Sequence, residues 1–161
     1  MTTWSRWMTF RAVLLLSGLS LVGYVAYRYT LFQPPSAGSL YGTIFPLSLL
    51  LAGAGIVLAV RPDTLDQLRG PRGFAVRGGL TAFGAVWMAT GAMCVASFAR
   101  AIPEAPLGGT IDMVHMLSDH VVLPLGIAAL AWAPARVARW LGARPAELAG
   151  GVEPTLIPGH G

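Results

Sequence analysis

The side chains best suited to chemistry lie close together in one segment: Asp112, His115, Asp119 and His120. Carboxylates and imidazoles bind protons and metal ions near neutral pH. In an α-helix, Asp112, His115 and Asp119 are spaced i, i+3 and i+7, within about 60° of one face, whereas His120 points about 100° away from Asp119. The sequence therefore predicts a polar cluster on one face of a helix.

Three interpretations of this cluster are open. In the first, the residues cap a helix at a membrane surface, and Arg100 pairs with Asp112 or Asp119. In the second, the cluster binds a proton or a small ligand. In the third, Asp112, His115 and Asp119 bind a metal ion as a carboxylate–imidazole–carboxylate set.

A haem held by two histidines of this chain is excluded. His115 and His120 lie five residues apart on one helix and cannot bind opposite sides of the same iron, and no other predicted span contains a histidine. A partner subunit would have to supply the second ligand. We therefore assign neither a cofactor nor a metal ligand from the sequence.

The composition defines the environment in which this cluster must work. Of the 161 residues, 55% are hydrophobic and only 11% are charged, and the mean hydropathy is +0.63. A soluble domain has about 25% charged residues, and a disordered chain has low hydrophobicity. The composition excludes both classes and predicts an all-α, multi-pass membrane protein whose partners are membrane lipids rather than nucleic acid.

Four apolar stretches predict four transmembrane helices with short loops in an up-down bundle. The predicted spans are about 10–30, 41–60, 77–99 and 113–137. They form one domain, 1–144, followed by a tail rich in glycine and proline, 145–161, which we expect to be disordered in the cytoplasm. The uncharged run 121–135 reaches only about 22 Å as a helix, short of a bilayer core of about 30 Å. The fourth span must therefore extend over Asp119 and His120, which places them inside the membrane.

The arginines predict the orientation of these spans. The chain has 11 basic residues, all arginine, and nine of them flank the N-terminus, the loop 61–77 and the C-terminal end of the last span. Only Arg28 and Arg100 lie in the other two connections. Basic loops stay in the cytoplasm, so we expect both termini to be cytoplasmic and the protein to lie in a bacterial inner membrane.

The third span carries a face of small residues. Gly84, Trp87, Gly91 and Cys94 recur at i, i+3, i+7 and i+10. Small residues let membrane helices approach closely, so this face predicts helix packing, either within the chain or between subunits.

The sequence contains no motif that predicts an enzyme. It lacks GxSxG, GxGxxG and the P-loop pattern, and one helix end offers few converging polar groups. We expect an accessory subunit that stabilises a larger complex of integral membrane subunits, for which an energy-transducing type is a guess. The alternative is a stand-alone sensor or transporter that uses the Asp/His cluster.

Overall fold

All elements assigned in the structure, a computed structural model, are helices. It describes residues 5–31, 38–68, 70–101, 103 and 106–143, so the predicted tail 145–161 lies outside the described residues. Three stretches are long and apolar enough to cross a membrane: Arg6–Thr30, Gly70–Val95 and Leu107–Trp132. The elements are α1 (Arg6–Thr30), α2 (Leu40–Ile44), α3 (Ser48–Val60), η1 (Thr64–Gln67), α4 (Gly70–Ala101), α5 (Pro106–Leu117), η2 (Ser118–Val122), α6 (Leu123–Trp132) and α7 (Pro134–Trp140).

The second predicted span, 41–60, is broken into α2 and α3. Pro46 lies in the turn between them, and a proline cannot donate the amide hydrogen bond of a continuous helix. The Phe45 carbonyl accepts hydrogen bonds from the Ser48 amide at 3.2 Å and from its hydroxyl at 2.5 Å. α3 has 13 residues, about 20 Å of helix. Three of the four predicted spans thus correspond to helices of membrane length, and the second does not.

The fourth predicted span is shifted toward the N-terminus. α5, η2 and α6 form one helical stretch that includes the cluster, as the length argument requires. The stretch ends at Trp132 because Ala133 leaves the helical conformation (φ −149°, ψ 51°) and Pro134 begins α7. The continuous helix therefore ends before the predicted limit at residue 137, and Arg136 lies in α7.

The third predicted span, 77–99, lies within the longer helix α4. This helix has 32 residues and begins at Gly70, whose φ of +66° suits a glycine, with Pro71 next in the chain. Arg77 donates to the Leu65 carbonyl at 2.8 Å and pairs with Asp66 at 2.9 Å. These contacts attach η1 to the first turns of α4.

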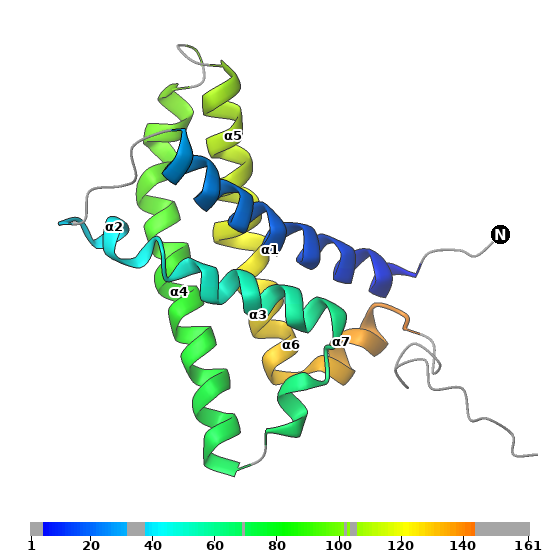
Figure 1. The fold of residues 1–161 in the computed structure, drawn as a ribbon. Helices are drawn as coiled ribbons and strands as arrows, with labels where there is room; N and C mark the ends of the chain where they lie inside the picture. Colours follow the sequence, from blue (N-terminus) through cyan, green and yellow to red (C-terminus); the bar gives the residue numbers. More distant parts are fainter. Residues whose placement is uncertain (1–4, 32–37, 69, 102, 104–105, 144–161) are drawn as a thin grey trace, which may run out of the picture.

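The helices form two pairs that cross each other (Figure 1). α1 and α3 lie side by side, and the pair of α4 with α5–η2–α6 runs across them. The predicted up-down bundle, in which neighbouring helices align along one axis, therefore does not describe this arrangement. The crossing brings the middle of α1 against η2, which determines the surroundings of the cluster.

Arg11 fixes one end of the α1–α3 pair. Its Nε donates to the Ala59 carbonyl at 2.6 Å and its Nη2 to the Val60 carbonyl at 2.7 Å. The last carbonyls of a helix have no partner within the helix, and a cation there also interacts favourably with the helix dipole. Arg11 thus caps α3 from a neighbouring helix.

Three glycines let apolar side chains cross between helices. We call these the apolar glycine contacts: Gly18 with Ile56, Gly55 with Leu123, and Gly126 with Leu14. An ideal Cβ at Gly126 would lie 2.7 Å from Leu14 Cδ1, and one at Gly18 would lie 2.8 Å from Ile56 Cγ1. They join α1, α3 and α6 in the core.

Candidate functional site

The cluster lies in a turn of π-helix. In η2 the Leu123 amide donates to the Ser118 carbonyl, five residues back, whereas an α-helix would direct this amide to the Asp119 carbonyl. The Asp119 carbonyl instead accepts from Trp87 Nε1 on α4 at 3.0 Å. The wider turn therefore supplies an acceptor to a neighbouring helix, as π-turns at functional sites often do.

The same turn brings the two histidines together. His115 and His120 approach to 3.2 Å between their Nε2 atoms, and both side chains are buried, at 1% and 0% exposure. The α-helical spacing used above directs His120 away from Asp119, and in the structure the Asp119 side chain contacts α1 whereas the His120 side chain contacts α4. The spacing did not predict the contact between His120 and His115, which the wider π-turn allows.

α4 positions His120 by a hydrogen bond, a stacked aromatic ring and a glycine that leaves space for the imidazole. His120 Nδ1 lies 2.6 Å from the Trp87 carbonyl oxygen, and the indole of Trp87 stacks on the imidazole with ring centroids 4.1 Å apart and planes at 14°. Gly91 provides the space, because an ideal Cβ there would lie 2.5 Å from His120 Cγ. We call Trp87, Gly91 and His120 the His120 cradle.

α1 and η2 hold the other end of the site. His115 Nδ1 and Asp119 Oδ2 are 2.7 Å apart, and the ring of Tyr24 stacks on His115 with centroids 3.6 Å apart. Asp119 also accepts from Ser118 at 2.6 Å and from Ser20 at 3.4 Å. The Asp119 side chain is fully buried, so its polar contacts among the described residues come from these neighbours.

These contacts determine where the protons lie. The Trp87 carbonyl only accepts, so His120 Nδ1 carries the hydrogen, and a neutral His120 then has a lone pair on Nε2. His115 Nε2 must therefore donate to it. One further proton lies between His115 Nδ1 and Asp119 Oδ2, and the three side chains together are neutral whichever of the two atoms carries it. We call His120, His115 and Asp119 the proton chain.

Asp112 and Arg100 lie outside the proton chain. Asp112 accepts a hydrogen bond from the Tyr24 hydroxyl at 2.7 Å, and Arg100 is exposed in the last turn of α4. The buried partner of Asp119 is His115. Asp119 thus has a close partner in His115 of α5 and Asp112 has one in Tyr24 of α1, and the pairing of Arg100 with either carboxylate stays a prediction.

The predicted packing face of α4 is used inside the chain. Gly84 faces Pro124 of α6, where an ideal Cβ would lie 3.0 Å from the proline Cβ. Trp87 and Gly91 face His120, and Cys94 is half-buried with a free thiol. Gly84, Trp87 and Gly91 of this face therefore pack α4 against η2 and α6.

A cavity of about 310 Å³ adjoins the proton chain between α1 and α5. Its lining includes Ser20, Gly23 and Tyr24 from α1 and Val114 and His115 from α5. Ser20 and His115 thus contact both the cavity and Asp119.

Sequence reasoning missed the parts of the site that come from other helices. Trp87 was expected only to pack, yet its carbonyl and indole bind His120 and Asp119. Ser20 and Tyr24 carry no local signal, since serine and tyrosine are common at such positions in membrane helices.

In the part of the chain that the structure describes, no three His, Cys, Asp or Glu side chains are arranged to hold a metal ion. The carboxylate–imidazole–carboxylate set of Asp112, His115 and Asp119 does not assemble, because Asp112 faces Tyr24. No family model, curated protein or solved structure matches this chain.

Proposed function

We propose that this chain is an integral membrane protein that binds and releases one proton at the proton chain, as a stand-alone sensor or transporter. The observation that carries the proposal is the 2.7 Å contact between the buried side chains of His115 and Asp119 in a helix of membrane length. Ionisable groups in such helices are costly and commonly mark proton pathways. An enzymatic activity is not part of the proposal.

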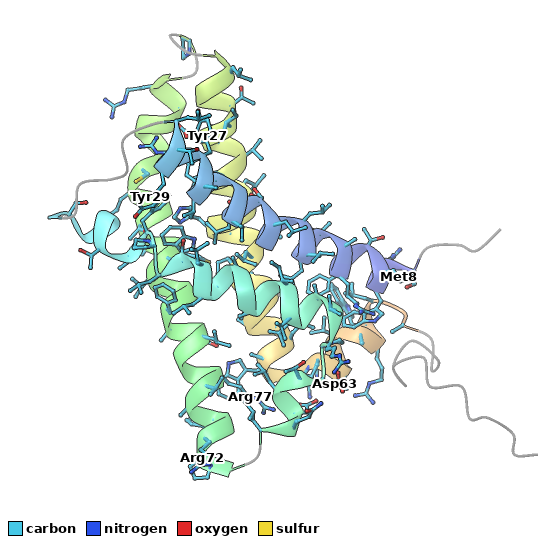
Figure 2. All side chains as sticks on the ribbon, in the orientation of Figure 1. Met8, Tyr27, Tyr29, Asp63, Arg72 and Arg77 are labelled. Carbon is cyan, nitrogen blue, oxygen red and sulfur yellow. The ribbon has the colours of Figure 1, made fainter. Side chains whose placement is uncertain are left out.

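The exterior of the helices supports a membrane location. Leu16 on α1, Leu50 on α3 and Val114 on α5 are more than half exposed, which suits contact with acyl chains better than contact with water. In Figure 2, Arg72 and Arg77 lie near the end of α4 that is remote from Tyr27. This separation supports the proposed orientation in a bacterial inner membrane, with both termini in the cytoplasm.

The construction of the site supports proton binding over a purely structural role. Replacing a buried ion pair by apolar side chains of similar volume is often neutral or stabilising, so packing alone does not require these residues. Both imidazoles are stacked on aromatic rings, and an aromatic face stabilises a cation. Among the described residues, the other titratable groups in contact with His115 or Asp119 are Tyr24 from α1 and His120 from η2, and α4 presents uncharged Trp87.

Infrared titration of the full chain in lipid vesicles tests the proposal. We expect a band from a buried carboxyl group that changes with pH and disappears in Asp119→Asn. The amide is nearly isosteric with the carboxyl group but cannot bind the proton. Asp112→Asn is the matched control, because it removes a carboxylate from the same helical stretch, outside the proton chain, and should preserve the Asp119 band.

The same experiment can contradict the proposal. Identical titrations for the parent protein and Asp119→Asn would show that Asp119 does not exchange its proton, and the site would then be structural. A loss of the band in Asp112→Asn but not in Asp119→Asn would show that Asp112, rather than Asp119, is the titrating carboxyl group.

An accessory subunit of a larger membrane complex is the second candidate. It is favoured by glycines on the outer faces of α3 and α4, since Gly53, Gly78 and Gly79 have no atom within 4 Å of an ideal Cβ. Such positions admit a close helix from another chain. Stoichiometric integral membrane partners after purification in mild detergent would favour this candidate over the first.

A further inference from the structure

The cavity between α1 and α5 has the dimensions of a small-ligand site. Its volume is about 310 Å³, at the lower end of the range of about 300–1,000 Å³ for small-molecule sites. Part of this space exists because Gly23 has no side chain, and an ideal Cβ there would meet no atom within 4 Å. The proton chain does not fill this volume.

The cavity opens toward the lipid-facing surface of the helices. Val114 lines it and is 56% exposed. Leu16 precedes Ser20 by one turn of α1, and Leu107 precedes Val114 by two turns of α5, and both are largely exposed. In a membrane Val114 contacts acyl chains, as do Leu16 and Leu107 on the same helices outside the lining, so a ligand must itself be membrane-soluble to enter.

The walls combine aromatic rings with hydroxyl groups. Tyr24 and Tyr27 supply the rings, and Ser20 and Thr110 supply hydroxyls. Within the described residues, the lining contains no arginine side chain, so an anionic headgroup has no permanent counter-charge there. An acyl chain has no polar atom to pair with these hydroxyls, whereas a ligand oxygen can accept a hydrogen bond from them. A flat ring that carries oxygens matches both kinds of wall.

We infer that this cavity binds a quinone-type ligand: a membrane-soluble planar ring with carbonyl or hydroxyl oxygens. The inference rests on the proposed membrane location and proton site. Ser20 connects the two, because it lines the cavity and donates to Asp119 over a long 3.4 Å contact. A ligand oxygen that accepts from Ser20 competes with Asp119 for the same hydroxyl, so ligand binding and the proton on Asp119 are coupled.

Binding of decylubiquinone to the full chain in phosphatidylcholine nanodiscs tests the inference. Quenching of the intrinsic fluorescence should saturate in the parent protein. Gly23→Leu fills the cavity and should weaken binding by about tenfold or more. Gly53→Leu is the matched control, because Gly53 is also an exposed helical glycine with no atom within 4 Å of its ideal Cβ and lies on α3. It should bind as the parent does.

Three outcomes would overturn the inference: no saturable quenching in the parent protein, unchanged binding in Gly23→Leu, or equal weakening in both variants. Saturable binding of oleic acid with no competition from decylubiquinone would assign the cavity to an acyl chain instead. The infrared titration of Asp119 contains no quinone. A normal titration without quinone binding would therefore overturn this inference alone, whereas loss of the titration would overturn the proposed function.

Discussion

In both the His120 cradle and the apolar glycine contacts, a glycine makes room for a side chain from a neighbouring helix. At Gly91, an ideal Cβ would lie 2.5–2.7 Å from His120 Cγ, Cβ and Nδ1. At Gly126, it would lie 2.7 Å from one terminal methyl group of Leu14, and the next atoms are 3.6 Å or more away. Both glycines admit a neighbouring side chain, but the neighbours differ in their freedom to move.

This difference determines how much an added methyl group lowers the free energy of unfolding at each position. The terminal methyl groups of the buried Leu14 make only non-directional van der Waals contacts, so a shift of this side chain breaks no hydrogen bond. His120 is held by hydrogen bonds to the Trp87 carbonyl and to His115 and by stacking on Trp87. A shift of its ring breaks directional contacts that have no replacement in the core. An added methyl group is therefore more destabilising next to a polar network than next to aliphatic side chains.

The largest expected effect is that of Gly91→Ala. The added methyl group displaces the His120 ring and separates it from Trp87 and His115. Leaving buried polar groups without partners costs about 1–3 kcal/mol each, and we expect the free energy of unfolding to fall by about 3 kcal/mol. Denaturation in detergent micelles would measure this loss, and the infrared titration of Asp119 should change with it.

Retention of both stability and titration in Gly91→Ala would contradict the comparison. It would mean that His120 can move as freely as Leu14, and that its hydrogen bonds do not fix its position.

A smaller effect is expected for Gly126→Ala. The Leu14 side chain moves aside, and the strain of overpacking is partly offset by the higher helix propensity of alanine. We expect a loss of about 1 kcal/mol in the same denaturation measurement, with an unchanged titration of Asp119. A loss as large as that of Gly91→Ala would show that the apolar contacts are just as rigid, and the distinction between the regions would fail.

The smallest effect is expected for the coupling between Arg100 and Asp119. Asp119 pairs with His115 inside the protein, whereas Arg100 is exposed. In a double-mutant cycle with Arg100→Gln and Asp119→Asn, we therefore expect a coupling energy below about 0.5 kcal/mol. Rescue of Asp119→Asn by Arg100→Gln would show instead that surface charge, rather than the buried partners, holds the site.

The sequence predicted the class of the fold from its hydropathy, and three of four spans correspond to helices of membrane length. It did not predict the interruption at 45–47, because a proline in an apolar run is compatible with either a kinked span or a broken one. The positions of the other helices decide between them: α1 packs along the short α3, and Arg11 caps its last carbonyls.

The sequence by itself determined which residues are candidates for chemistry, since Asp112, His115, Asp119 and His120 are the ionisable side chains of the apolar stretch 107–132. Only the tertiary structure decided their roles. The π-turn depends on Trp87 of α4, which takes up the carbonyl that an α-helix would have used, and the approach of His120 depends on Gly91. Helical periodicity describes a helix in isolation, whereas the hydrogen bonds that stabilise this turn come from helices distant in the chain.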